Sequence, residues 1–211
     1  MTITEARRER RSLYRLVLDG EREVAVDVRT FDESAFRVGG GITEEQLEAL
    51  LALSMHNRAR ERALYLLGIR DYACRELERK LLDEATPEVA AAVVARLAEV
   101  GLLNDERYAA QTARSLQEYK HLPRRRVTQE LQRRGVARET AQAAAEDLAG
   151  EDFEQALAIL RKRYYNKMSD RDARQRTAAA LARRGFSYEA VRQAMLAFDA
   201  AAHDDIEEIE D

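Results

Sequence analysis

Residues 129–136 read QELQRRGV, and residues 179–186, one period of 50 later, read AALARRGF. A weaker copy, RKLLDEAT, occupies residues 79–86. A leucine followed by a polar turn at a fixed period is typical of one helical unit repeated along the chain. The repeat predicts an all-α protein of three tandem three-helix repeats in an elongated, bent array. Such arrays serve more often as binding surfaces than as enzymes.

The composition supports long amphipathic helices. Of 211 residues, 45% are hydrophobic and 35% are charged, and only two prolines and nine glycines interrupt the chain. Cys74 is the only cysteine, so no disulfide can form within the chain, and we expect it to be a small core residue. Residues 1–11 are polar and Arg-rich, and no apolar segment has membrane-spanning length. We therefore expect a soluble, cytoplasmic protein.

The charge is unevenly distributed. Residues 115–196 hold 17 Lys and Arg against 11 Asp and Glu, whereas residues 199–211 hold seven acids and no Lys or Arg. A basic body indicates an anionic partner. The acidic tail is either an inert solubilising segment or an internal competitor for the basic face. We expect the tail to be disordered after Ala202.

The N-terminal region predicts a small β-hairpin subdomain between Leu13 and Val28. Asp19 and Gly20 separate two segments rich in β-branched residues, and this pair tolerates the positive φ of a tight turn. Two strands alone are marginal in water. The hairpin must therefore pack on another element, or gain a third strand from residues 35–38. The glycine run at residues 39–41 is predicted to be a hinge.

Helix signals follow the glycine run. Thr43 and Gln46 form a capping-box signature, and the first helix is expected to reach Leu67 with a break near His56. Gly135 and Gly185 are expected to end the middle helices of two repeats, whereas Ala85 in the first repeat requires a different or strained turn. Later helices are predicted to begin near Tyr72, Pro87, Asn104, Pro123, Ser169 and Ser187. The predicted divisions of the chain are 1–41, 42–102, 103–150, 151–200 and the acidic tail 201–211.

Catalytic signatures are absent from the sequence. No G-x-x-x-x-G-K-[ST] motif for nucleotide phosphates is present. His56, His121 and His203 are scattered, and no Cys/His group has the spacing of metal ligands. We therefore expect no enzymatic activity, no cofactor and no metal site.

Basic clusters are the best candidates for a functional surface. Each cation alone is more simply explained as part of a solvated helix face, with pairs such as Arg126 and Glu130. Together the cations favour an anion-contacting face, although arginine binds carboxylates and phosphates alike. Tyr164 and Tyr165 can stack on bases, but Tyr164 also continues a core stripe. The candidate residues are Lys120, Arg124, Arg125, Arg126, Arg133, Arg134, Arg161, Lys162, Arg163, Tyr165, Lys167, Arg174, Arg183 and Arg184.

Residues 101–109, GLLNDERYA, resemble the stretch G-[YL]-L-[DN]-D-E-R-[FY]-A of the RecX family of regulatory proteins. Other blocks are similar to the same family and occur in its order and spacing between about residues 63 and 198. Two positions depart from the family pattern: Ala85 replaces a glycine, and His121-Leu122 stands where a glycine often precedes the proline. The further matching blocks are residues 75–77 with 80–81, residues 123–126 with 130–131 and 135–136, and residues 183–188 with Val191.

The resemblance implies a function. RecX proteins bind the RecA recombinase filament on single-stranded DNA, lie in its groove, and inhibit its ATPase, strand-exchange and co-protease activities. By this resemblance the partners are the RecA filament and, weakly, single-stranded and double-stranded DNA. We expect a monomer that binds no membrane. Two alternatives stay open: a free-standing DNA-binding module that acts without RecA, and a general helical scaffold.

Overall fold

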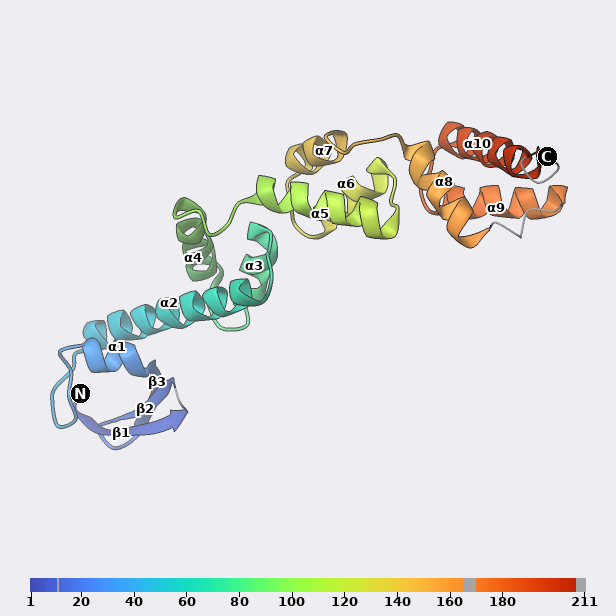
Figure 1. Ribbon diagram of the computed structural model, residues 1–211. Helices are drawn as coiled ribbons and strands as arrows, with labels where there is room; N and C mark the ends of the chain where they lie inside the picture. The colour runs from blue at the N-terminus through green and yellow to red at the C-terminus, as the bar shows by residue number, and fades with distance from the viewer. Residues whose placement is uncertain (11, 165–169, 208–211) are drawn as a thin grey trace. The chain divides into compact units, whose positions relative to one another are not determined.

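A computed structural model of the chain describes residues 1–10, 12–164 and 170–207 (Figure 1). The chain divides into two compact units, Met1–Leu103 and Asn104–Asp211. The first unit contains a small sheet and the first three-helix repeat, and the second contains the other two repeats. None of the helices in the described ranges is both long and apolar enough to cross a membrane.

An antiparallel sheet opens the first unit. Its strands β1 (Ile3–Arg10), β2 (Leu13–Leu18) and β3 (Arg22–Asp27) lie in the order β1-β2-β3. The predicted hairpin is confirmed as β2 and β3, which pair from Leu13 with Asp27 to Leu18 with Arg22. Asp19 and Gly20 between them have φ values of 50° and 81°. The turn therefore uses the positive φ that this pair tolerates.

The third strand is not the predicted one. Residues 35–38 lie in no strand, and β1 at the N-terminus fills the place beside β2. Most of β1 is charged and exposed, while Ile3 is fully buried in the core of the sheet. Charged residues suit an edge strand because they discourage pairing with other chains. A short helix not predicted from the sequence, α1 (Val28–Glu33), follows β3 and is capped by Asp27.

The glycine run differs from the predicted hinge. The Gly39 amide donates to the Ile3 carbonyl at 2.7 Å, and the Ile3 amide donates to the Gly40 carbonyl at 3.0 Å. Two hydrogen bonds between the same segments hold the run against the start of β1. The chain consequently enters the next helix from a fixed position beside the sheet.

The long helix α2 (Glu44–Ile69) serves two cores. Thr43 and Gln46 form the predicted capping box, but the helix is continuous through His56 and passes Gly68. Near its start, Leu47 packs in the sheet core. Near its end, Ala63 packs in the first-repeat core, together with α3 (Cys74–Leu81) and α4 (Pro87–Glu99). Cys74 packs against that same core, as expected.

The second unit repeats a three-helix arrangement. Its second repeat comprises α5 (Asp105–Lys120), α6 (Arg124–Arg133) and α7 (Arg138–Glu146). Its third repeat comprises α8 (Asp152–Arg163), α9 (Arg171–Arg183) and α10 (Tyr188–Glu207). The predicted caps Thr86, Asn104 and Ser187 accept hydrogen bonds from backbone amides. Asp170 caps α9, and Ser169 lies outside the described residues.

The final helix extends further than the sequence indicates. Residues 202–207, assigned to the acidic tail, continue α10 as far as Glu207. The sequence of this stretch is AHDDIE, and it contains no glycine or proline that would end a helix. The predicted end of the helix near Ala202 was therefore five residues too early.

The same type of backbone turn joins the last two helices in the second repeat and in the third repeat. The Val136 amide donates to the Leu131 carbonyl at 3.1 Å, and the Phe186 amide donates to the Leu181 carbonyl at 3.4 Å. The intervening glycines, Gly135 and Gly185, have φ values of 98° and 99°. This is the six-to-one hydrogen bond of a glycine-terminated helix. The 50-residue period is therefore a repeat of backbone geometry as well as of sequence.

The first repeat turns without a glycine. The Ala85 amide donates to the Leu81 carbonyl at 3.0 Å, and Ala85 is not among the described residues with positive φ. Leu81 is nevertheless fully buried, like Leu131 and Leu181. The first repeat therefore keeps the buried leucine and changes the turn, which avoids the left-handed strain of an alanine.

Gly185→Ala tests the turn. An L side chain is strained at φ 99°, and an added Cβ would lie 2.5 Å from Arg126 Cγ, which must move aside. We expect a loss of about 1 to 2 kcal/mol in the free energy of unfolding, measured by urea unfolding followed by circular dichroism.

Gly68→Ala is the matched control for this substitution. Gly68 lies inside α2, and an added Cβ would meet nothing within 4 Å. We expect a gain of about 0.5 to 1 kcal/mol, because alanine favours the helix. Equal effects of the two substitutions would contradict the proposed role of the turn.

Candidate functional site

The first turn of α6 concentrates positive charge. Arg124, Arg125 and Arg126 follow Pro123 directly, and this turn contains no acidic residue. Cations at a helix N-terminus oppose the helix dipole. Local helix stability therefore does not explain the three arginines.

The Arg124 side chain forms hydrogen bonds within the chain. Its guanidinium donates from Nη2 to the Leu148 carbonyl at 2.6 Å and to the Gly150 carbonyl at 3.0 Å. Its backbone amide donates to Asp152 Oδ1 at 3.0 Å, at the start of α8. These bonds fasten the second repeat to the segment that leads into the third. Arg124 was predicted to contact a partner, but its guanidinium is occupied by these bonds within the chain and has a structural role.

Two further polar contacts complete this junction. Gln117 Nε2 donates to the Ala149 carbonyl at 3.1 Å, and His121 Nδ1 lies 3.0 Å from Gln155 Oε1. His121 caps α5 with a φ of 49°, in the left-handed region that favours glycine. Its side-chain contact across the junction offers one reason for a histidine there. The sequence carried no signal for these pairs, because their partners are more than 30 residues apart.

Arg126 lies over the turn of the next repeat. It is exposed and donates to Gln129 Oε1 at 3.1 Å, and its aliphatic carbons lie beside Gly185. The start of α6 and the end of α9 therefore meet. The absence of a Cβ at Gly185 provides space for the arginine stem.

Glu130 neutralises two other candidate cations. It accepts hydrogen bonds from Arg133 at 2.8 Å and from Arg134 at 3.0 Å. The expected pairing of Arg126 with Glu130 is wrong, because these two arginines occupy the carboxylate. The hydrogen bond from Arg133, reinforced by Arg134, lowers the pKa of Glu130 from 4.5 to about 2. Both arginines therefore already form an ion pair within α6 and its C-terminal cap.

Two candidates in the third repeat are only partly exposed. Arg174 on α9 forms an ion pair with Asp199 on α10, so its charge is balanced within the repeat. Arg184 is half-buried at the C-cap of α9. Tyr164 is also half-buried and packs against the third-repeat core, as the continuation of its apolar stripe predicted. Tyr165 and Lys167 lie outside the described residues.

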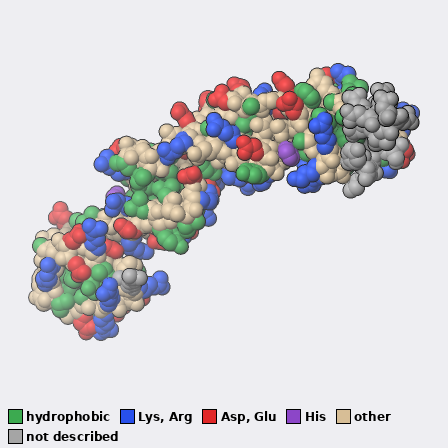
Figure 2. All heavy atoms as spheres, viewed as in Figure 1, with side chains coloured by type: hydrophobic (Ala, Val, Ile, Leu, Met, Phe, Trp, Pro, Cys, Tyr) green, Lys and Arg blue, Asp and Glu red, His purple; other side chains and the backbone are tan. Residues whose placement is uncertain are grey.

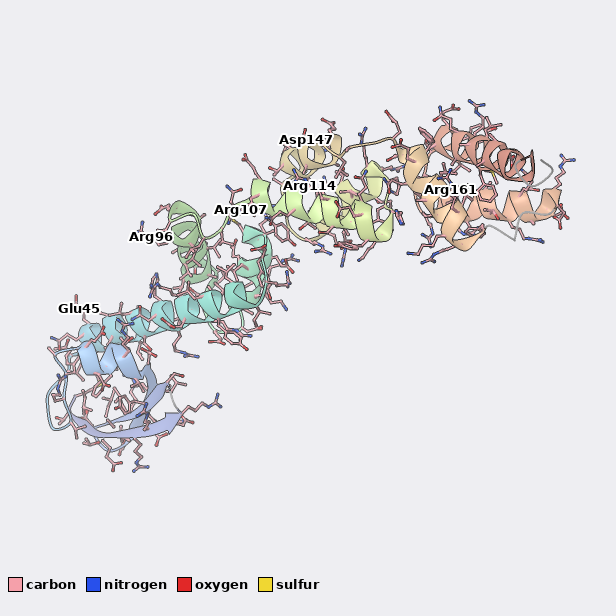
Figure 3. All side chains as sticks on the ribbon, in the orientation of Figure 1. Glu45, Arg96, Arg107, Arg114, Asp147 and Arg161 are labelled. Atoms are coloured by element: carbon pink, nitrogen blue, oxygen red, sulfur yellow. The ribbon has the colours of Figure 1, made fainter. Side chains whose placement is uncertain are left out.

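The remaining candidates form the set that we call the exposed cations. They are exposed, and none has an ion pair with an acid in the part of the chain that the structure describes. Three of them occupy the last turn of α8, where Arg161 is labelled in Figure 3. Cations at a helix C-terminus suit the dipole, so this position is compatible with a purely structural role as well. The exposed cations are Lys120, Arg125, Arg161, Lys162, Arg163 and Arg183.

The face of the molecule drawn in Figure 2 is mixed in charge, with basic and acidic side chains interspersed. Within the described ranges, no group of three or more His, Cys, Asp and Glu residues is arranged to hold a metal ion. The arrangement offers separated guanidinium and ammonium groups, which bind carboxylates or phosphates by charge-assisted hydrogen bonds.

Three family models match the chain in order. They describe the first three-helix domain of RecX over residues 59–97, the second over residues 104–144 and the third over residues 150–195. The matches follow the three repeats of the structure. Together they cover more than half of the chain.

Known relatives carry the same family name. A "Regulatory protein RecX" from Trichlorobacter lovleyi is 36% identical over 137 residues, which is 62% of this chain and 89% of the relative. One from Halorhodospira halophila is 37% identical over 142 residues, which is 66% and 88%. A solved structure, "Crystal structure of regulatory protein RecX", superposes with a TM-score of 0.65 at 21% identity, over 92% of this chain and 98% of the other. This superposition supports the fold.

Arg124→Ala and Arg125→Ala distinguish a structural arginine from an exposed one. Removing the Arg124 guanidinium leaves the Leu148 and Gly150 carbonyls without their donor. We expect a loss of about 2 to 3 kcal/mol in the free energy of unfolding for Arg124→Ala. For the exposed neighbour Arg125 we expect a change within about 0.5 kcal/mol. Chemical unfolding of both variants measures this, and equal losses would rule out the junction role of Arg124.

Glu130→Gln tests the ion pairs of Glu130 with Arg133 and Arg134 through the pH dependence of stability. The folded-state pKa of Glu130 is lowered to about 2, so its contribution to stability is present above 4.5 and is lost as the pH falls towards 2. We expect the variant to be less stable by about 1 to 2 kcal/mol near neutral pH, after allowance for solvent screening. The difference from the unsubstituted protein should shrink as the pH falls below 4.5. A pH-independent difference in unfolding free energy would refute the ion-pair origin.

Proposed function

This chain belongs to the RecX family, and on that basis we propose that it binds the filament of the RecA recombinase on single-stranded DNA and inhibits it. The inhibited activities are the DNA-dependent ATPase, strand exchange and co-protease action. The observation that carries the proposal is the ordered match of all three RecX domains over residues 59–195. Because all three domains are present in the family's order, the chain has the complete set of three-helix units of the family.

The proposed action is binding without catalysis. The protein acts as a monomer in the cytoplasm and requires no cofactor. Repeated three-helix units suit a protein that contacts several neighbouring subunits, because arrays of this kind present extended surfaces. Inhibition then follows from occupying the filament, with no chemical step in this chain.

The exposed cations are proposed to contact the filament. Arg125 on α6 and Arg161 and Lys162 on α8 are accessible without breaking an internal ion pair with a described acid. Guanidinium groups bind carboxylates and phosphates in the same fork geometry. These residues therefore suit acidic groups of RecA and the phosphates of the bound DNA.

Bare DNA is proposed to be a weak partner. The sequence has a net charge of −4 and a pI of about 5.6, which disfavours tight nonspecific attraction to a polyanion. Any phosphate contact releases counterions, so this component of binding should weaken steeply with salt. Strong binding requires protein contacts in addition.

The proposal is tested by titrating the protein into RecA on saturating single-stranded DNA while ATP hydrolysis is followed. Inhibition at far less than one molecule per RecA subunit is the expected result, because a filament-bound regulator affects many subunits. Inhibition only when the protein is abundant enough to cover the DNA would instead support a free-standing DNA-binding module.

Charge reversal tests the exposed cations in the same assay. Arg125→Glu combined with Arg161→Glu removes two accessible cations and should weaken inhibition about tenfold or more, because it replaces attraction by repulsion. Circular dichroism should show that the variant is folded.

The control uses two cations outside the candidate set. Arg107→Glu combined with Arg114→Glu makes the same charge change at exposed positions of α5, both labelled in Figure 3. This control should inhibit like the unsubstituted protein. Equal weakening by both pairs would mean that net charge, not the proposed surface, governs inhibition.

A further inference from the structure

The third repeat carries an apolar groove between α9 and α10, which run side by side in Figure 1. Its volume is about 550 Å³. Alanines of α9 form one side, and larger apolar side chains of α10 form the other. The apolar lining residues are Ala178, Ala179, Ala182, Tyr188, Val191, Met195 and Leu196.

Two large side chains of this groove are open to solvent. Tyr188 is 83% exposed and Leu196 is 57% exposed. The core of the repeat, in which Leu181, Phe186 and Phe198 are buried, shares Val191 with the floor of the groove but does not include Tyr188 or Leu196. The exposed pair therefore adds little to the folding of the repeat. Contiguous exposed apolar surface on a soluble domain commonly marks a binding site.

The second repeat provides an internal comparison. Fifty residues earlier, Gln129 and Gln132 stand in place of Ala179 and Ala182. Arg138 and Glu146 stand in place of Tyr188 and Leu196 in the same way, and all four of these polar residues are exposed. The three-helix fold is thus built equally well with polar residues at these positions. The apolar character of the groove belongs to the third repeat and is not a requirement of the unit.

The cations that line the groove are paired with acids, and further cations lie beside it. Arg174 and Arg192 line the groove and form ion pairs with Asp199 and Glu189. Arg171 and Arg183 are exposed and extend the α9 side of the groove by one turn at either end, since they lie four residues from Gln175 and Ala179. An occupant with apolar anchors and acidic flanks complements this arrangement.

We propose that the groove receives an amphipathic helical segment of the partner protein, with two or three apolar anchors and acidic residues beside them. Helix-in-groove recognition uses anchors spaced one turn apart on one helix face. Small alanines on one side allow such a helix to approach closely. This inference rests on the proposed function, so the segment belongs to a RecA subunit of the filament. DNA is the poorer occupant, because most of the lining side chains are apolar and the two arginines that line the groove are already paired with acids.

The test replaces the exposed apolar pair by the residues of the second repeat. Tyr188→Arg combined with Leu196→Glu copies Arg138 and Glu146, which the chain already places at equivalent exposed positions. The matched control is Tyr119→Arg combined with Leu102→Glu, because these residues are 80% and 51% exposed and lie outside the groove. Both double variants leave the net charge unchanged. Leu196→Glu alone serves if the double variant does not fold.

Binding is measured by fluorescence anisotropy of labelled protein against RecA filaments on single-stranded DNA, and against the same DNA without RecA. We expect the groove variant to bind filaments at least about tenfold more weakly, as for loss of a central apolar anchor. The control variant should bind filaments normally, and binding to DNA alone should be unchanged in both.

The possible failures are distinguishable. Normal filament binding by the folded groove variant would overturn the groove inference and leave the proposed function intact. Weaker binding to bare DNA as well would assign the groove to nucleic acid and overturn the protein-segment proposal. Failure of the unsubstituted protein to bind filaments would remove both the proposed function and the inference that rests on it.

Discussion

The fold of the second unit depends on a backbone hydrogen bond that occurs at equivalent positions in its two repeats. The amide of residue 136 or 186 reaches back to the carbonyl of the buried leucine, Leu131 or Leu181, across a glycine with positive φ. This bond ends the middle helix and sends the chain into the third helix at a fixed angle. The leucine and the residue that follows the glycine, Val136 or Phe186, are both buried in each repeat, and Leu181 and Phe186 pack in the core of the third repeat. Because the turn is backbone geometry, the helices can vary in surface residues from repeat to repeat without loss of the unit.

That freedom explains how similar units carry different surfaces. Arg124 and Arg174 stand at the same repeat position, yet Arg124 binds the carbonyls of Leu148 and Gly150 just beyond α7 and Arg174 pairs with Asp199 within α10. In both cases an arginine near the start of the middle helix contacts the third helix of its repeat or the segment that follows that helix. The outer positions of these helices are free to differ, and in the third repeat they form the apolar groove. Conserved packing with variable faces is what a repeat protein requires to contact a partner at several places.

Much of the architecture was predictable from local signals. Thr43, Asn104 and the glycines at 135 and 185 act through neighbours only a few residues away, so their effects could be read from sequence. The third strand was missed because five of the eight residues of β1 are charged, and its place at the sheet edge depends on tertiary pairing. The role of Arg124 was missed for a related reason, since a guanidinium that binds carbonyls about 25 residues away resembles any other surface cation in the sequence. The structure therefore sorts the candidate cations into internal and exposed ones, a distinction that composition cannot make.

The proposed function requires that the chain bind the RecA filament in preference to the DNA within it. The most direct measurement compares the affinity of the protein for RecA filaments on single-stranded DNA with its affinity for the same DNA without RecA, over a range of salt concentrations. We expect much tighter binding to filaments, with a shallower loss of affinity as salt rises, because protein contacts supplement the phosphate contacts. Equal affinity and an equal salt dependence for the two would contradict it and identify the chain as a DNA-binding module.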